Sequence, residues 1–326
     1  MSTHGNILCA CNHSLYNHIE NLTVLQMDRS DVAPGYTKLM CTQLATVHCM
    51  HASMVETEIG NMYLSSDVWR NLHNYYHPDY RVLEVREQPA QGPSNPLSFH
   101  IPGVSAPPIH TDYVDAIICD CPEILQSWMN RPRMHDWPSA EIIQEISSLE
   151  AHVVPVGNKG SPLKFLEWRI CFTRAEIRLI HSFNDCQTKL VVLLKMIAKS
   201  SLKPVCKEMT TYIMKNIVLW MAELFPVDYF TPENLFQALK SALMFLRECL
   251  VARCLPSYMI PERNLLANRL GRRGRLRLTA RDRLCAMIDI LLNEDTRMLL
   301  RCERIRKSWN ILLISPDLFY LSTMNS

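Results

Sequence analysis

Residues 168–200 read WRICFTRAEIRLIHSFNDCQTKLVVLLKMIAKS, and the spacing of apolar residues changes within this stretch. Residues 168–172 predict a short strand, whereas the apolar side chains at 190, 191, 194 and 197 recur at helical spacing. From about residue 173 onward almost every segment predicts a helix. The chain therefore divides into a half of strands and loops and an all-helical half, joined near residues 173–186, which is an α+β fold class.

The half before residue 173 predicts strands separated by polar loops. Short strand-like stretches lie at 22–27, 36–40, 80–85, 113–119 and 153–156. Trp137-Pro138-Ser139 precedes apolar residues at helical spacing, so we expect a helix there with Ser139 as its cap. Six prolines between Pro89 and Pro108 predict an irregular insertion, because proline cannot donate a hydrogen bond to a neighbouring strand.

The second half predicts helices at 175–183, 187–200 and 208–225, and a longer one after Thr231-Pro232-Glu233. In that tripeptide the threonine is a preferred helix cap, the proline suits the first turn, and the glutamate complements the helix dipole. No internal repeat is found. We therefore expect a helical domain that is not a repeat array.

The composition excludes several classes of protein. The 34 Lys and Arg residues nearly balance the 32 Asp and Glu residues, so the chain is not a globally basic coat for nucleic acid. Its nine glycines form neither a P-loop nor a GxGxxG fingerprint. The most apolar segment, 217–225, contains Glu223 and is far shorter than about 18 uncharged residues, so we expect no membrane span and no membrane partner.

Thirteen cysteines are scattered along the chain without a CxxC pair. With no signal-peptide pattern after Met1, they predict reduced thiols in a cytoplasmic or nuclear protein. Cys119 and Cys121 share one face at a strand end and are interpreted as buried hydrophobic thiols. A further group of metal-ligand types comprises His4, Cys9, Cys11 and His13. It matches no common zinc module, so a frayed terminus is the preferred interpretation.

The helix at 187–200 predicts a cationic face. Lys195 and Lys199 stand one turn apart, and Lys203 continues just beyond the helix. The next helix adds a hydroxyl, an aromatic ring and a cation, from Thr211, Tyr212 and Lys215. These groups are suited to a triphosphate or a base, although lysines on a solvated helix face are the commoner explanation.

Eight arginines lie between Arg263 and Arg283, half of them in one run after Gly271. Clustered positive charge in a nearly neutral chain is typical of a local polyanion-binding surface. A mobile arginine-rich loop, balanced by nearby Asp and Glu residues, is an equally good interpretation. The candidate polyanion-binding residues are Arg272, Arg273, Arg275 and Arg277.

Several separated motifs carry a family resemblance. They are Trp168-Arg-Ile-Cys-Phe-Thr, Ala175-Glu-Ile-Arg-Leu-Ile, Asn184-Asp-Cys-Gln-Thr-Lys, Leu193-Leu-Lys, Thr211-Tyr-Ile-Met-Lys and Tyr258-Met-Ile-Pro-Glu-Arg-Asn-Leu. In this order they resemble the Mab-twenty-one-like proteins and the cyclic GMP-AMP synthase-like receptors of animals, the invertebrate branch most closely. The resemblance covers about residues 20–270.

The resemblance implies a nucleotidyltransferase-like sheet lobe packed on an all-helical lobe of HhH/H2TH-like character. In this chain the sheet lobe would occupy residues 1–183 and be incomplete at its start. The helical domain would occupy 184–290, and 291–326 would be a C-terminal tail.

The resemblance also implies roles for four residues. Arg169 resembles the arginine that contacts the nucleotide, and Lys195 the lysine that faces it from the helical lobe. Tyr212 resembles the aromatic residue that stacks on a base, with Thr211 as the hydroxyl partner beside it. Catalytically active members of the family join nucleoside triphosphates into a cyclic dinucleotide after sensing double-stranded nucleic acid, by two-metal phosphoryl transfer.

The sequence departs from the family at the metal site. The family uses a Gly-Ser turn and three carboxylates, two of them as Asp/Glu-x-Asp, and none of the fourteen aspartates here completes that pair. Gly160-Ser161 lies in the wrong place, and Glu56-x-Glu58 lacks the glycine turn. By register with the family, we expect the chain to begin just after the missing acids. Asp115 is the candidate for the third acid and Asp112 the alternative, but one carboxylate cannot hold two Mg²⁺ ions.

These observations predict a protein that binds a nucleoside triphosphate or double-stranded nucleic acid without catalysing transfer. No metal residue and no cofactor are predicted, and the chain leaves no room for the zinc insertion of the mammalian synthase. Two alternatives remain. The chain is a fragment of an active receptor that makes a cyclic dinucleotide in innate immunity, with Mg²⁺ or Mn²⁺ in the longer form, or it is a protein-interaction scaffold.

Overall fold

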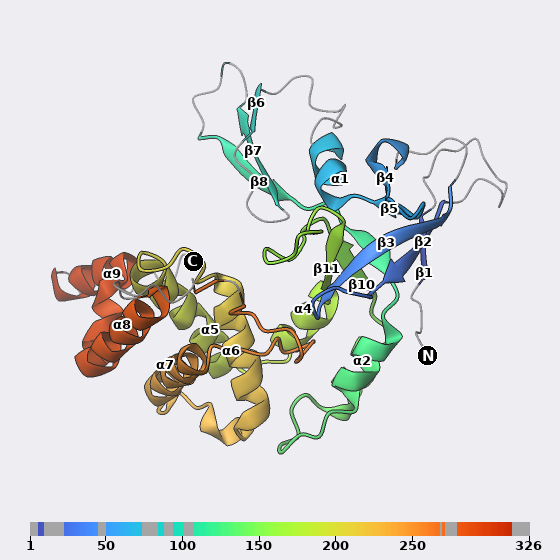
Figure 1. Cartoon of the computed structure of the whole chain (residues 1–326). Helices are drawn as coiled ribbons and strands as arrows, with labels where there is room; N and C mark the ends of the chain where they lie inside the picture. The colour runs from blue at the N-terminus through green and yellow to red at the C-terminus, as the bar shows by residue number, and fades with distance from the viewer. Residues whose placement is uncertain are drawn as a thin grey trace. The chain divides into compact units, whose positions relative to one another are not determined.

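The computed structural model describes residues 6–9, 23–44, 50–73, 84–87, 94–100, 103, 107–267, 269–270 and 279–314. It shows an α+β fold, as the sequence predicts, with strands in the first half and helices in the second (Figure 1). The chain divides into two compact units. The sheet unit comprises Met1–Asn130 and Ser147–Glu176, and the helical unit comprises Arg131–Ile146 and Ile177–Ser326.

The main sheet of the sheet unit is antiparallel, and its described strands follow the order β1-β2-β3-β11-β10-β9. These strands are β1 (Asn6–Cys9), β2 (Thr23–Asp28), β3 (Tyr36–Gln43), β9 (Ile117–Cys119), β10 (Ala151–Val154) and β11 (Glu167–Cys171). The short strands β4 (Met54–Glu56) and β5 (Met62–Leu64) extend it, because β5 pairs with both β3 and β4. Strands β1 and β9, at opposite ends of the order, approach each other, so the sheet curls.

Strand β11 lies in the middle of this sheet and anchors its core. Trp168 is fully buried, and its Nε1 donates a hydrogen bond to the Leu64 carbonyl oxygen at 2.9 Å. Its ring lies edge-on to the Trp69 ring, with 6.1 Å between centroids. The predicted strands at 22–27, 36–40, 153–156 and 168–172 correspond to β2, β3, β10 and β11.

A second sheet contains β6 (Glu84–Glu87), β7 (Asn95–His100) and β8 (Ile109–Tyr113) in that order. Strand β7 lies within the segment that its prolines predict to be irregular, and that prediction is wrong for residues 95–100. Pro96 is tolerated because β6 pairs only with residues 97–100, so Pro96 faces a partner on the β8 side alone. The sheet unit also contains helices α1 (Ser66–His73) and α2 (Pro122–Met129).

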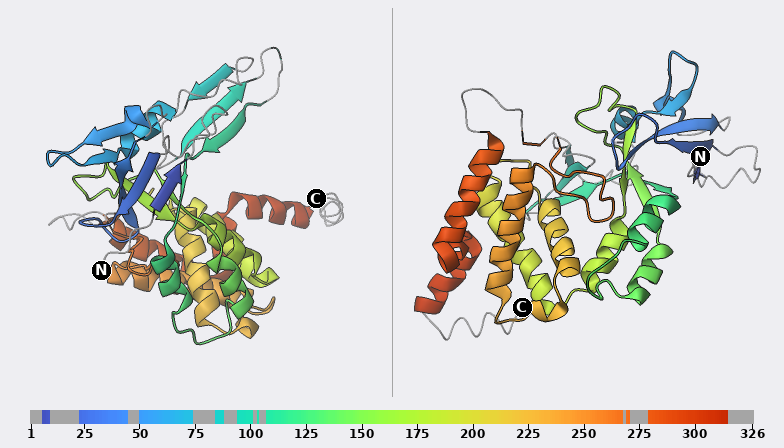
Figure 2. Two further views of the ribbon diagram at one scale, coloured as in Figure 1. Left: turned by 90° about the vertical axis from the view of Figure 1, so that its right-hand side faces the viewer. Right: turned by 60° about the horizontal axis from the view of Figure 1, so that its bottom comes forward.

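The helices of the helical unit are α3 (Ala140–Ser147), α4 (Thr173–His181), α5 (Asp185–Ile197), α6 (Thr211–Leu224), α7 (Leu235–Ala252), α8 (Ala280–Glu294) and α9 (Glu303–Ile314). Among them, α5 lies beside α6 and α7, and α7 lies beside α8 (Figures 1 and 2). Helices α3 and α4 each run past a boundary of the unit. A π-helical turn, Ala198–Leu202, follows α5, and 3₁₀ turns occupy Val227–Tyr229 and Asp295–Arg301. None of the described helices combines the length and apolar character that crossing a membrane requires.

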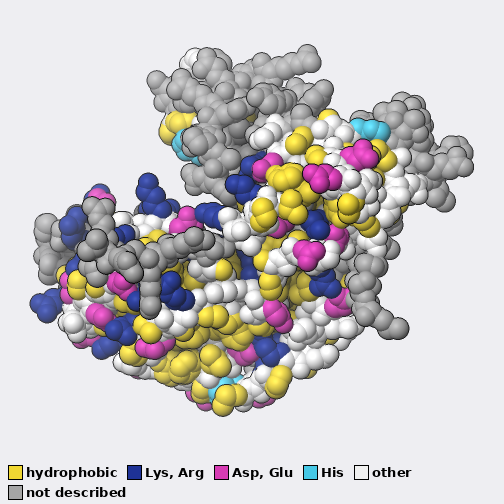
Figure 3. Space-filling view, in the orientation of Figure 1, with side chains coloured by type: hydrophobic (Ala, Val, Ile, Leu, Met, Phe, Trp, Pro, Cys, Tyr) yellow, Lys and Arg dark blue, Asp and Glu magenta, His cyan; other side chains and the backbone are white. Residues whose placement is uncertain are grey.

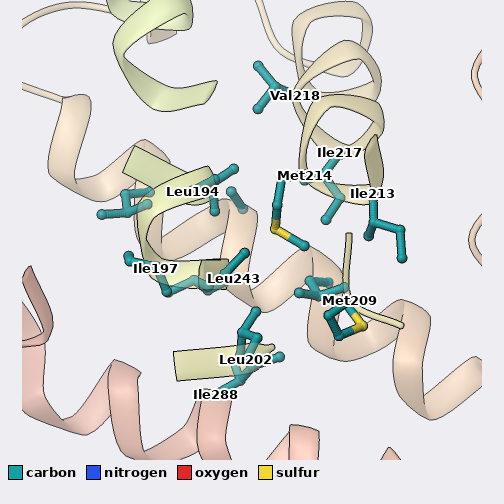
Figure 4. Close-up of a cluster of buried hydrophobic side chains, with 14 of the residues drawn as sticks. Leu194, Ile197, Leu202, Met209, Ile213, Met214, Ile217, Val218, Leu243 and Ile288 are labelled. Atoms are coloured by element: carbon teal, nitrogen blue, oxygen red, sulfur yellow. The ribbon is translucent and has the colours of Figure 1, made fainter. Parts of the chain in front are cut away.

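The core of the helical unit lies between its helices (Figure 4). Leu194 and Ile197 of α5 and Met214 and Ile217 of α6 point into this space, and all four are fully buried. Burying an aliphatic side chain of this size stabilises the fold by about 1.5–3 kcal/mol relative to its exposure. The core therefore fixes which sides of α5 and α6 remain in solvent.

The two units differ from the predicted domain boundaries in two segments. Arg131–Ile146, predicted to lie in the first lobe, belongs to the helical unit. Residues 291–314, predicted as part of a tail, form the end of α8, a 3₁₀ turn and α9. Met298 and Cys302 are buried in the helical core, so this segment packs as part of the unit.

Candidate functional site

Helix α5 begins with a complete capping box. The Asn184 side chain accepts a hydrogen bond from the Gln187 backbone N–H at 2.9 Å, and the Gln187 side chain accepts one from the Asn184 backbone N–H. The Asn184 amide also donates to the Phe230 carbonyl oxygen at 3.1 Å. The cap sets where the helix starts and, together with the buried apolar residues, determines which residues face solvent.

The solvent side of α5 and of the turns after it carries a row of lysines. Lys195 and Lys199 are exposed one turn apart, and Lys203 and Lys207 follow at the same interval, both exposed. We call these four residues the lysine row. None of them forms an ion pair with an Asp or Glu of the described residues, in contrast to Lys189, whose Nζ lies 2.6 Å from Asp185 Oδ2. The cationic face expected from the sequence ended at Lys203, and Lys207 extends it.

Helix α6 begins with a weakly capped first turn. Thr210 has the extended backbone of a cap residue, but its side chain makes no capping bond, and its hydroxyl oxygen is buried without a hydrogen-bond partner among the described residues. Thr211 is exposed at the first helical position. A helix start whose amides are not capped by a side chain can bind an anion such as a phosphate.

Tyr212 is half-buried and packs against the helical core. The Lys215 Nζ lies 5.0 Å from the centroid of its ring, at cation–π distance. The exposed part of the ring and this ammonium group lie on the same turn of α6. The base-stacking role that the resemblance implies for Tyr212 stays a prediction.

Acidic and basic side chains are interspersed on the visible face of the helical unit (Figure 3). Two arginines of the helical unit are paired with carboxylates: Arg247 Nε lies 2.6 Å from Asp289 Oδ1, and Arg301 Nη2 lies 2.5 Å from Glu294 Oε1. Positive charge at such positions is locally compensated. The lysine row differs because its charges are uncompensated among the described residues.

Arg169 belongs to the sheet unit. It lies on β11, in register with Tyr36 of β3 and Val154 of β10, and it is half-buried. The other predicted nucleotide-binding residues, Lys195, Thr211 and Tyr212, belong to the helical unit. Each of these side chains is therefore placed within its own unit.

Asp115 does not lie on a strand. The predicted strand at 113–119 is interrupted at residues 114–116, with β8 before the break and β9 after it, so Asp115 is in the link between two different sheets. The prediction of one continuous strand is wrong because its two ends pair with different partners. Asp115 is half-buried, and the alternative, Asp112, is exposed on β8.

Tyr258, in the last motif of the resemblance, has an architectural role. It is almost fully buried, and its hydroxyl donates a hydrogen bond to Glu223 Oε2 at 2.7 Å. Its backbone N–H donates to Asn216 Oδ1 at 2.8 Å. Burial and the neighbouring Glu223 raise the pKa of Tyr258 above its usual value, so its phenol remains protonated.

Two arginines complete this network, which sequence reasoning missed. Arg131 Nη2 lies 2.7 Å from Glu223 Oε2, and Arg133 Nε lies 3.3 Å from the same oxygen. The Arg131 guanidinium also lies over the rings of Trp220 and Tyr258, 4.5 and 4.7 Å from their centroids. We call Arg131, Arg133, Glu223 and Tyr258 the Glu223 network; it ties residues 131–133 to α6 and to the segment after α7.

The candidate polyanion-binding arginines, and most of the His and Cys residues near the start of the chain, are not among the described residues. Arg272, Arg273, Arg275 and Arg277 lie outside the described residues, as do His4, Cys11 and His13. Within the described part of the chain, no three His, Cys, Asp or Glu side chains lie together so that they could hold a metal ion.

The helices and loop between α5 and the start of α8 form a known domain. Residues 186–279 match the Mab-21 protein HhH/H2TH-like domain. The Mab-21 domain includes Lys195, Thr211 and Tyr212 and the buried Tyr258, whereas Arg169 and Asp115 lie outside it. The match covers less than a third of the chain and confirms the predicted HhH/H2TH-like domain. Assignment to the cyclic GMP-AMP synthase-like receptors, and to their invertebrate branch, stays a prediction.

Proposed function

We propose that this chain binds a nucleotide or nucleic acid through its Mab-21 domain, and that it does not catalyse nucleotidyl transfer. The observation that carries the proposal is the lysine row, whose four exposed ammonium groups have no carboxylate partner among the described residues. Such a row is suited to phosphate groups. Each lysine that neutralises a phosphate of a polyanion releases a counterion that was condensed on the polyanion, which favours binding.

The start of α6 supports a phosphate or nucleotide ligand more specifically. Its first turn lacks a side-chain cap, Thr211 is exposed there, and Tyr212 offers a partly exposed ring beside Lys215. Helix amides and a cation suit phosphate oxygens, and an aromatic ring suits a base. Arg169 belongs to the sheet unit, and its contact with a nucleotide is proposed from the resemblance alone.

The absence of catalysis is proposed from the carboxylates. Two-metal phosphoryl transfer needs several anionic ligands to offset the repulsion between two divalent cations. The 326 residues contain no Asp/Glu-x-Asp pair. Asp115 and Asp112 therefore have no partner pair of this kind with which to assemble a two-metal centre.

Binding is tested by titrating the purified chain with fluorescent ATP and GTP analogues and with labelled double-stranded RNA and DNA, at several salt concentrations. We expect the Lys195→Ala/Lys199→Ala variant to bind nucleic acid more weakly and with a smaller salt dependence, by about one unit of slope per lost phosphate contact. Tyr212→Ala is expected to weaken mononucleotide binding more than polyanion binding.

Lys189→Ala is the matched control, because Lys189 lies on the same helix but is paired with Asp185. Its titration curves are expected to equal those of the wild type. If the double variant also binds every ligand like the wild type, the lysine row has no role and a protein-interaction scaffold is the better explanation.

Catalysis is tested separately. The chain is incubated with ATP and GTP, Mg²⁺ or Mn²⁺, and double-stranded RNA or DNA, and the products are separated by chromatography. We expect no cyclic dinucleotide. A cyclic product that disappears in Asp115→Asn would show that the chain is an enzyme with Asp115 in its active site.

A further inference from the structure

Three sulfur atoms from two distant segments meet in the sheet unit. Cys119 is the last residue of β9, Cys121 precedes α2, and their Sγ atoms are 3.7 Å apart. Met27, on β2, brings its Sδ to 3.7 Å from Cys121 Sγ. Cys119 and Cys121 are both free thiols. We call these three residues the sulfur cluster.

The chain geometry makes the two thiols converge. In a regular strand, residues i and i+2 lie about 7 Å apart with parallel side chains. Here the chain leaves the strand after Cys119, and Cys121 has φ −135° and ψ 57°. The bend turns Cys121 toward Cys119, so a two-residue spacing yields a pair of adjacent sulfurs.

The sulfur cluster is held in place and is reachable. Met27 and Cys119 are almost fully buried, 4% and 3% exposed, whereas Cys121 is half-buried. A cavity of about 450 Å³ opens beside the two thiols and is also lined by Asp120 and Glu150. Asp120 adds a carboxylate to the cavity wall, which favours the entry of a cation, whereas Glu150 is paired with Arg174.

We propose that the sulfur cluster binds one monovalent soft metal ion, Cu(I), with the thiolates of Cys119 and Cys121 and the thioether of Met27 as ligands. Thiolate and thioether are the ligands that select Cu(I) in proteins. With metal–sulfur bonds of about 2.3 Å, the sulfurs around a three-coordinate ion lie about 4 Å apart. The two distances from Cys121 Sγ, to Cys119 Sγ and to Met27 Sδ, are within a few tenths of an ångström of that value.

The ligand set favours Cu(I) over Zn²⁺. Structural zinc takes four ligands in a tetrahedron, nearly always Cys, His or carboxylate. Among the described residues no third side chain of these types joins Cys119 and Cys121. A thioether is a poor ligand for zinc and a good one for Cu(I).

Binding must displace protons. A metal ion coordinates the thiolate and releases the proton. The affinity for Cu(I) is therefore expected to rise with pH.

The test uses the whole reduced chain under anaerobic conditions, with Cu(I) supplied as its bicinchoninate complex. We expect the wild type to bind the first equivalent of Cu(I). Cys119→Ser and Cys121→Ser are each expected to weaken this binding by more than about tenfold. Met27→Leu keeps the size and apolar character of the side chain and is expected to weaken binding by about tenfold. Cys249→Ser, which removes a buried thiol on α7, is the control and is expected to bind like the wild type.

Two readouts on the wild type do not depend on the stability of any variant. One equivalent of Cu(I) should protect the half-buried Cys121 from alkylation, as located by peptide mass spectrometry, while the exposed Cys254 is still alkylated. X-ray absorption should show three sulfur neighbours around copper. Equal alkylation of Cys121 with and without copper, or equal affinity of the Cys119→Ser variant, would overturn the proposal.

Discussion

Glu223 is a buried carboxylate, and one of its oxygens accepts hydrogen bonds from Arg131, Arg133 and Tyr258. Removing a buried ionic partner leaves the opposite charges uncompensated, which costs about 3–5 kcal/mol. We therefore expect Glu223→Ala to lower the free energy of unfolding of the chain by about that amount, as measured by urea denaturation.

Tyr258→Phe is the comparison for this prediction. It removes one donor and leaves both arginine contacts of Glu223, so the expected loss is about 1 kcal/mol. Equal losses for Glu223→Ala and Tyr258→Phe would show that the charge of Glu223 contributes nothing beyond one hydrogen bond.

Asp28 predicts a pH dependence of stability. Burial raises its pKa, but hydrogen bonds from Ser30, Lys38 and Tyr63 outweigh that effect and lower the pKa to about 2. A group whose pKa is lower in the folded state stabilises the fold above its unfolded pKa, near 3.8, and loses that contribution as pH falls toward 2. We expect part of the fall in unfolding free energy between pH 5 and 2, about 1–2 kcal/mol, to disappear in Asp28→Asn.

Asp31→Asn is the matched control for Asp28→Asn. Asp31 is exposed and has a φ of 56°, which asparagine tolerates as well as aspartate. Urea denaturation of Asp31→Asn at pH 7 and pH 3 should match the wild type. A pH dependence that is unchanged in Asp28→Asn would contradict the assignment.

At the scale of single residues, the sequence predicts which side chains are exposed to solvent better than it predicts which side chains contact one another. The helical spacing of α5 was sufficient to place Lys195 and Lys199 in solvent. Nothing in the spacing indicated the Glu223 network, because Arg131 and Arg133 lie 92 and 90 residues before Glu223. Contacts of that range are determined by the tertiary fold and leave no periodic signal in the sequence.

At the scale of helices, the first turns of α5 and α6 differ in how they are capped. Asn184 forms a full capping box, whereas the Thr210 hydroxyl makes no capping bond. We expect Asn184→Ala to lower the free energy of unfolding by about 1–2 kcal/mol and Thr210→Ala to change it by less than about 0.5 kcal/mol. Thermal and urea unfolding of the two variants would show the difference, and equal losses would contradict it.

The end of α7 carries a conformational cost. Arg253 caps it with φ 55° and ψ 26°, the left-handed region that glycine adopts without strain, and its Nη2 is buried without a partner among the described residues. We expect Arg253→Gly to raise the unfolding free energy by about 0.5–1 kcal/mol. Arg253→Ala keeps the strain and removes the guanidinium, so a gain as large in the alanine variant would show that the backbone is not the cause.

Helices and strands whose apolar residues recur with a clear period are predicted from the sequence. Strands whose limits depend on which neighbouring strand they pair with are not. Strands β2, β3, β10 and β11 and helices α4, α5 and α6 lie close to their predicted positions. The stretch 113–119 was predicted as one strand because its residues favour strands throughout. Its division depends on pairing with β7 on one side of the break and β10 on the other.

At the scale of the molecule, the helical unit requires residues 131–146. Arg131 and Arg133 of this segment neutralise the buried Glu223. We expect the double variant Arg131→Ala/Arg133→Ala of the whole chain to unfold at a lower temperature than the wild type, as followed by circular dichroism. Glu223→Ala should destabilise the wild type more than the double variant, and equal effects would show that the segment contributes no charge pairing.

The domain that a family model matches was predictable, and its supporting segments were not. Residues 186–279 contain several motifs in order, which is why the resemblance identified the HhH/H2TH-like domain. Residues 131–146 and 291–314 contain no such motif, yet they pack with the same unit. The joint arrangement of Arg169 with Lys195 and Tyr212 depends on both units and remains a prediction from the resemblance.

The central position of β11 constrains the order of events during synthesis. Strands β3 and β10 each pair with β11 and not with one another. The part of the sheet that contains β3 and the part that contains β10 are therefore joined only when residues 167–171 add β11 between them. Until residues 167–171 have left the ribosome, the edge of β3 that β11 will cover is open and able to pair with a neighbouring nascent chain. A pause in translation that delays the emergence of these residues would therefore prolong the interval in which that edge can aggregate.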